Sequence, residues 1–159
     1  MNTMNLTKTM IALTLTTGFA AADDDGRELS LADCPAAVRT TIEAQARDGR
    51  IEEVEHHAIG DQALYIAEVD LPKDLDLKIH VRENGTLVKT VEDVPHDKAP
   101  RFLGQLATER NGRLEDIEKE TAGEKVIWHV EIDRAGQPDL NLIVDASGNL
   151  VRETEDHDD

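Results

Sequence analysis

Two stretches of the 159-residue sequence decide the fold, because they repeat one pattern at a fixed spacing. The first is residues 49–55, GRIEEVE, and the second is residues 112–118, GRLEDIE. Extending the match at the same shift of 63 residues covers 42 positions without a gap, and 13 of them are identical. Ordinary composition gives roughly 3 identities over that length. The sequence therefore predicts two tandem repeats, which we place at residues 34–94 and 95–155.

A short helix is predicted at the start of each repeat, over residues 34–47 and 98–110. Both segments carry a proline in the first turn and apolar residues four positions apart, and both end just before a glycine. Asp33 and Asp97 immediately precede them and are the predicted N-caps.

Strand patterns follow each glycine, and apolar and polar residues alternate in them. The four predicted strands of the first repeat are residues 51–57, 63–70, 75–82 and 87–91. In the second repeat the corresponding apolar alternation covers residues 128–132 and 140–144 and resumes at Leu150. Asn84-Gly85 and residues 146–149 supply the tight hairpin turns before the last strand of each repeat.

The predicted fold class is α+β, in which each repeat is a short helix packed on an antiparallel four-strand meander. Strict alternation gives such a sheet one apolar face, covered by the helix, and one polar face open to solvent. A unit of about 60 residues buries too little surface to be stable alone. We therefore expect the two repeats to meet near Val94-Pro95 and to share one continuous eight-strand sheet.

The N-terminal segment reads as a secretory signal peptide at residues 1–22. Its only charge is Lys8, and an apolar run from Met10 to Phe19 is followed by three alanines. That run is too short for the roughly 20 residues that span a bilayer, so we expect no stable membrane insertion after cleavage. The expected location is the periplasm or the extracellular space. Acidic segments at residues 23–33 and 156–159 are expected to act as solubilising ends.

Charge and cysteine content exclude several classes of function. The chain has 34 acidic and 17 basic residues, a formal charge of −17. Nucleic acids and anionic lipid surfaces require clustered lysine and arginine, so neither is an expected partner. A single cysteine excludes an intramolecular disulfide and a cysteine-rich metal site.

The order of these motifs resembles the PepSY-like domains. The resemblance rests on the proline-started helix, on GRIEEVE, on YIAEVD at residues 65–70, and on an alternating strand that ends in Val-x-x-x-Gly-x-Leu. The second repeat ends in VDASGNL at residues 144–150, close to the family pattern Val-Asp-x-x-Gly-x-Leu, whereas the first repeat lacks this aspartate. The family consists of exported modules similar in fold to the beta-lactamase inhibitor protein (BLIP). The resemblance implies a binding or inhibitory role outside the cytoplasm, with no catalytic residue and no cofactor.

The sequence contains no pattern of residues that indicates an enzymatic activity. Cys34 lies at the start of the first helix, but no histidine is placed near it in a recognisable catalytic pattern. Metal binding is the alternative that the sequence leaves open. His57 and His80 with a carboxylate could hold zinc, although no ligand spacing supports this. Two sets of aspartates could collect near a loop and hold calcium: Asp70, Asp74 and Asp76 in the first repeat, and Asp133, Asp139 and Asp145 in the second.

The open face of the predicted sheet is the best candidate for a binding surface. Alternation places on it both charged and apolar side chains, more apolar ones than a solvated face requires. The candidate binding residues are Ile66, Glu68, Lys78, His80, Arg82, His129, Glu131, Asn141 and Ile143. We therefore expect a non-enzymatic exported protein that binds a protein or peptide partner, to inhibit or chaperone it. The alternative is a periplasmic protein that binds calcium or zinc.

Overall fold

Nine antiparallel strands form one continuous sheet in the computed structural model, which describes residues 26–156. Within that range two α-helices pack on the sheet, α1 over Ala36–Gln45 and α2 over Arg101–Glu109. The strands are β1 Arg27–Leu29, β2 Arg50–Ile59, β3 Gln62–Leu71, β4 Leu75–Arg82, β5 Leu87–Asp93, β6 Arg113–Ala122, β7 Lys125–Asp133, β8 Leu140–Asp145 and β9 Leu150–Glu155. The predicted α+β class with a continuous antiparallel sheet is confirmed.

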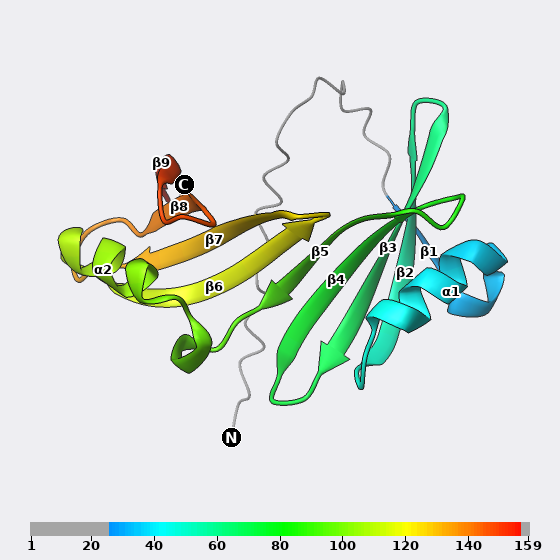
Figure 1. Cartoon of the computed structure of the whole chain (residues 1–159), viewed down its shortest axis with the longest axis horizontal. Helices are drawn as coiled ribbons and strands as arrows, with labels where there is room; N and C mark the ends of the chain where they lie inside the picture. The colour runs from blue at the N-terminus through cyan, green and yellow to red at the C-terminus, as the bar shows by residue number, and fades with distance from the viewer. Residues whose placement is uncertain (1–25, 157–159) are drawn as a thin grey trace.

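Strand order in the sheet follows the chain from β1 to β9. Helix α1 precedes β2–β5 and helix α2 precedes β6–β9, and Figure 1 shows each helix beside the strands that follow it. We call residues 34–94 the N-terminal half and residues 95–155 the C-terminal half. The halves meet where β5 pairs with β6, from Thr90 opposite Thr121 to Asp93 opposite Glu118. This junction has only four cross-strand pairs, so it is short compared with the strands that it joins.

The prediction of eight strands is wrong by one, because β1 lies inside the segment predicted to be an acidic solubilising end. It pairs antiparallel with β2, from Arg27 opposite His56 to Leu29 opposite Val54. Leu29 packs against the apolar core, and the burial of its side chain stabilises the ordered segment. The strand thereby covers the outer edge of β2.

The predicted N-caps are also wrong. Asp33 belongs to a short 3₁₀ turn, Leu31–Asp33, and accepts a hydrogen bond from the hydroxyl of Ser30 at 2.6 Å. Asp97 lies in the corresponding turn, His96–Lys98. The N-cap positions belong instead to Pro35 and Pro100, and neither side chain caps the helix. Proline fixes φ near −65° and keeps the preceding residue out of helical conformation, so each α-helix begins after the proline.

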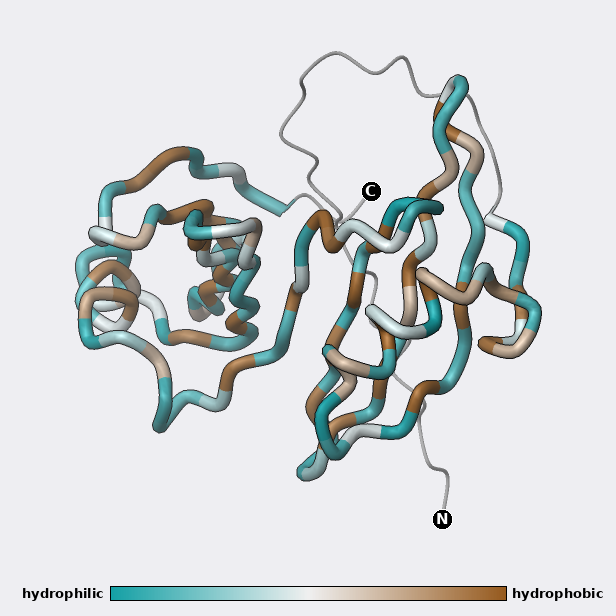
Figure 2. Tube along the Cα trace, turned by 45° about the vertical axis from the view of Figure 1, so that its right-hand side comes forward, coloured by the Kyte–Doolittle hydropathy of each residue, from teal (hydrophilic) through white to brown (hydrophobic). Residues whose placement is uncertain are grey.

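Two apolar cores lie between the helices and the sheet. Val38 and Ile42 of α1 pack on β2–β4, where Leu77 and Ile79 are fully buried. Leu103 and Ala107 of α2 pack on β6–β8 around Trp128. Along the strands these residues alternate with polar ones, visible as brown and teal bands in Figure 2. The alternation read from the sequence is thus the alternation that builds the cores.

The predicted signal peptide, residues 1–22, lies outside the described residues, as do residues 23–25 and 157–159. Between residues 26 and 156, no helix has the length and apolarity needed to cross a membrane.

Candidate functional site

Both helices pack on the same face of the sheet, and the register shows this directly. Ala67 of the first core lies opposite Ile79, which lies opposite Thr90. Thr90 in turn lies opposite Thr121, and Thr121 lies opposite Val126, which packs against the second core. Residues directly opposite in antiparallel strands point to the same face. Between residues 26 and 156, no helix covers the other face, which runs across both halves, and we call it the open face.

The register places all nine predicted binding residues on the open face. In the N-terminal half Ile66 lies opposite His80, Glu68 opposite Lys78, and Arg82 opposite Leu64. In the C-terminal half His129 lies opposite Ile143 and Glu131 opposite Asn141. The two groups are connected because Lys78 is opposite Val91, Val91 opposite Glu120, and Glu120 opposite Ile127. Alternation thus predicted which residues share this face.

Exposure on the open face is uneven. Arg82 is exposed, whereas most of the other predicted residues are half-buried. Ile143 and its neighbour Ile127 are only 7% and 4% exposed, and they belong to neither helix-side core. Ile143 therefore contributes to packing and offers little surface to a partner in this conformation. This differs from the accessible position that alternation alone suggested, because alternation assigns a face and not an exposure.

A charged cluster lies on the open face beside the β5–β6 junction. The carboxylate of Glu120 is 3.1 Å from Lys89 Nζ and 3.3 Å from His129 Nε2. The hydrogen bond to His129 and the nearby Lys89 lower the pKa of Glu120 to about 2. Its side chain is only 15% exposed, so these contacts hold a charge that water reaches poorly.

His80 is the neutral member of this region. Its burial, together with the positive charge of Lys89, lowers its pKa to about 4. The imidazole is therefore uncharged at neutral pH. The ring lies opposite Ile66 across β3 and β4.

Carboxylates at corresponding positions of the two halves have different surroundings. Glu68 forms an ion pair with Lys78 at 2.5 Å. Glu131, 63 residues later, lies opposite Asn141, and its carboxylate oxygen is within 4.8 Å of those of Glu115 and Asp139. Burial and the charges of the surrounding acidic side chains raise the pKa of Glu131. Sequence reasoning did not identify the acidic group Glu115–Glu131–Asp139.

The predicted metal ligands are not brought together as expected. Within residues 26–156 the acidic group just described is the only set of three potential ligands close enough to share an ion, and it contains no histidine. The zinc set of His57 and His80 with a carboxylate is therefore not formed. His57 instead contacts Glu55 at 2.9 Å. Of the predicted calcium sets, only Asp139 belongs to a close group.

Asp145 stabilises the turn before β9. Its carboxylate accepts hydrogen bonds from the backbone N–H groups of Ser147 and Asn149 at 2.8 and 2.9 Å and from the Asn149 side chain at 2.9 Å. These hydrogen bonds lower the pKa of Asp145, and the bond from the Asn149 side chain has the largest effect. Its oxygens are thus engaged by the turn, as the hairpin interpretation predicted.

Cys34 is unsuited to nucleophilic chemistry. Its side chain is 5% exposed, and its thiol lies 3.5 Å from the carbonyl oxygen of Ser30. Burial and the nearby Asp33 raise the thiol pKa, which disfavours the reactive thiolate.

Comparisons with known proteins identify the fold. No family model matches the chain, and no curated protein sequence matches it. Solved structures do match. A DUF2874 family protein from Bacteroides uniformis is 17% identical with a TM-score of 0.58, covering 77% of this chain and 89% of that protein. A proposed periplasmic protein from Bacteroides eggerthii is 12% identical with a TM-score of 0.59, covering 77% and 88%.

A BLIP-like protein from Bacteroides fragilis is also similar, with 12% identity and a TM-score of 0.56 over 79% of this chain and 90% of that protein. At such low identity the likeness establishes the fold alone. The chain thus has the fold of these proteins, and its similarity to the PepSY-like domains stays a prediction from the sequence.

Proposed function

We propose that this chain is an exported, non-enzymatic protein that binds a protein or peptide partner on its open face, as an inhibitor or a chaperone. One observation carries the proposal. Both helices pack on one side of the nine-strand sheet, and the other side presents a helix-free surface that is continuous across both halves. A surface of this breadth that mixes apolar and charged side chains is suited to a macromolecular partner.

Export is supported by the signal-peptide pattern of residues 1–22. The similar fold of a proposed periplasmic protein agrees with it. The absence of enzymatic activity is supported by the buried thiol of Cys34 and its raised pKa. It is also supported by the engagement of Asp145 in a turn.

The chain is further proposed to consist of two tandem PepSY-like repeats. Matched contacts 63 residues apart support this. Arg50 pairs with Asp70 at 2.7 Å, and Arg113 pairs with Asp133 at 2.6 Å. The close approach of Gly49 to the backbone oxygen of Asp70 recurs between Gly112 and the oxygen of Asp133.

Site-specific crosslinking in the native host tests the binding proposal. A photoreactive amino acid replaces Arg82 or Arg152, which are exposed on the open face in the two halves. Matched controls replace Glu43 on α1 or Gln105 on α2, which are exposed on the helix side. We expect a discrete adduct from the open-face positions only. Adducts from the helix positions alone, or from no position, would overturn the proposal.

Cation binding is the second candidate, and the close approach of Glu115, Glu131 and Asp139 favours it. Calorimetric titration with calcium and with zinc distinguishes the two functions. Partner binding predicts only weak, nonspecific heats. A stoichiometric, high-affinity isotherm that disappears in Glu131→Gln would favour the cation-binding function.

A further inference from the structure

The C-terminal half of the open face carries half-buried carboxylates that form no ion pair with a cation within residues 26–156. In the N-terminal half Lys78 neutralises Glu68. The corresponding Glu131 faces Asn141 across β7 and β8, and within residues 26–156 it forms no hydrogen bond or ion pair. It is half-buried and surrounded by other acidic side chains.

The cations nearest in the sequence are engaged elsewhere. Arg113 pairs with Asp133 at 2.6 Å. Arg134 donates to the carbonyl oxygen of Pro138 and pairs with Glu155 at 2.9 Å. Neither of these two arginines forms an ion pair with Glu131.

Glu118 adds a second carboxylate of the same kind. It lies on the open face opposite Asp93 on β5 and opposite His129 on β7. It is half-buried and forms no hydrogen bond or ion pair within the described part of the chain. Burial and the charge of Asp93 raise its pKa, while the charges of His129 and Lys78 act in the opposite direction.

A partner that covers the open face must remove water from these carboxylates. Desolvating an unpaired carboxylate opposes binding strongly, whereas a cation that pairs with it offsets the loss. We propose that the partner is basic where it crosses the C-terminal half, and that its arginine or lysine side chains pair with Glu118 and Glu131. The inference rests on the proposed function, because it applies to whatever segment covers this face. In the N-terminal half Lys78 already pairs with Glu68. Glu53, which lies opposite Glu68, is half-buried, and burial and the charge of Glu68 raise its pKa, so a covering segment meets one such carboxylate there as well.

Selection from a random peptide library displayed on phage tests the inference with defined probes. The full chain is the bait, and EDTA is present throughout. Selected peptides are synthesised, their affinities are measured by fluorescence anisotropy, and their positions are mapped by amide chemical shifts. We expect peptides enriched in arginine and lysine that shift amides of β6 and β7. Their affinity should fall as salt rises, because screening weakens ion pairs.

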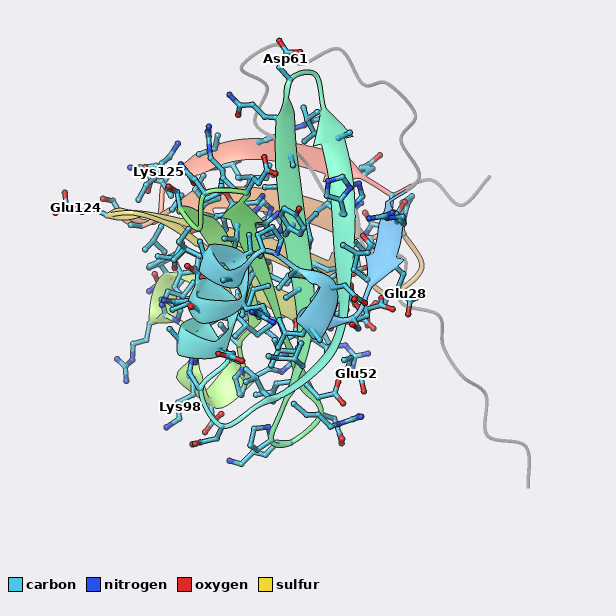
Figure 3. The ribbon with its side chains drawn as sticks, turned by 90° about the vertical axis from the view of Figure 1, so that its right-hand side faces the viewer. Glu28, Glu52, Asp61, Lys98, Glu124 and Lys125 are labelled. Atoms are coloured by element: carbon cyan, nitrogen blue, oxygen red, sulfur yellow. The ribbon has the colours of Figure 1, made fainter. Side chains whose placement is uncertain are left out.

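Substitutions then assign the contacts. E118Q/E131Q should weaken the selected peptides by about tenfold or more, the loss expected for charge-assisted hydrogen bonds in a desolvated interface. Both substitutions relieve repulsion, so the fold should be retained, which thermal unfolding verifies. Glu124→Gln is the matched control, because Glu124 lies at the exposed tip of the β6–β7 hairpin (Figure 3). It should change affinity by less than twofold.

The outcomes separate the inference from the proposed function. Peptides that map to the open face but lack basic residues, or that bind E118Q/E131Q unchanged, overturn the inference and leave the proposed function standing. Peptides that map to the helix side, or a selection that yields no binder, count against both. Loss of binding when millimolar calcium replaces EDTA would show that the carboxylates hold a metal ion, and would also overturn the inference.

Discussion

In the N-terminal half Arg50 pairs with Asp70, and in the C-terminal half Arg113 pairs with Asp133 at the corresponding position. The open faces of the same two halves differ, because Lys78 neutralises Glu68 whereas Asn141 leaves Glu131 without a cation. The matched arginine–aspartate pairs lie on the open face as well, because Asp70 and Asp133 stand two residues after Glu68 and Glu131. The two halves therefore share one ion pair on this face and differ in the next pair of positions, which shows that the charge of the open face can change while the strand pairing is kept.

The largest expected effect tests whether the two halves behave as one cooperative unit. Ile79 and Leu142 occupy corresponding, buried positions in the two cores. Ile79→Ala and Leu142→Ala should each lower the free energy of unfolding by about 2–5 kcal/mol, because each leaves a cavity. Urea denaturation followed by circular dichroism should show a single transition in both variants.

Asp61→Ala is the control, because Asp61 lies at the exposed tip of the β2–β3 hairpin (Figure 3). It should change the free energy of unfolding by no more than about 0.5 kcal/mol. Two separate transitions in either core variant would show that the shared sheet does not couple the halves.

The next effect concerns the shared scaffold contacts. A Cβ atom at Gly49 would lie 2.8 Å from the backbone oxygen of Asp70, and at Gly112 it would lie 2.7 Å from that of Asp133. Gly49→Ala and Gly112→Ala should therefore each cost about 1–3 kcal/mol of stability, measured by urea denaturation.

Gly104 is the contrasting glycine, because a Cβ atom there meets nothing within 4 Å. Gly104→Ala lies inside α2 and should stabilise the protein by about 0.5–1 kcal/mol. A cost in only one of the Gly49 and Gly112 variants would mean that the matched close approaches are not equivalent.

A smaller effect on stability is expected from the charged cluster of Glu120, Lys89 and His129 beside the β5–β6 junction. Glu120 has its pKa lowered from 4.5 to about 2, so the folded state favours its charged form. That stabilisation is present above the unfolded pKa and is lost as pH falls from about 4.5 through about 2. Glu120→Gln should thus cost about 1–2 kcal/mol at pH 7 and much less near pH 2.

Urea denaturation at a series of pH values measures this difference. The exposed Glu124 provides the control, and Glu124→Gln should show no such pH-dependent loss. An equal cost for Glu120→Gln at pH 7 and near pH 2 would mean that its contacts with Lys89 and His129 do not depend on its charge.

The sequence predicted those parts of the fold that depend on local pattern. Alternation identified the cores and the shared open face, and the aspartate-containing turn before β9 was interpreted correctly. The helix starts were misplaced because Asp33 and Asp97, which are good capping residues, stand two and three residues before a proline, and each α-helix begins only after that proline. Strand β1 was missed because a strand of three residues is too short to show an alternation of apolar and polar side chains.

The sequence predicted which residues share the open face, but it did not predict the surroundings of their side chains. Alternation assigned Ile143 to the open face, but its burial depends on neighbouring strands and side chains that a single strand does not encode. The grouping of Glu115 with Glu131 and Asp139 depends on strand register across β6–β8. Register follows from turns and bulges, such as the shift between Leu114 and Ile117, which the sequence pattern did not reveal.

The smallest expected effect addresses the charge difference between the halves directly. Asn141→Lys would give Glu131 the partner that Lys78 gives Glu68, and it should stabilise the protein by about 0.2–1 kcal/mol. The reverse change, Lys78→Asn, should cost a similar amount, and high salt should reduce both effects. Thermal unfolding at low and high salt measures them. If Asn141→Lys were destabilising at low salt, the halves would differ in strand geometry at this position and not only in charge, because an ammonium group that reaches Glu131 can only relieve the repulsion among its acidic neighbours.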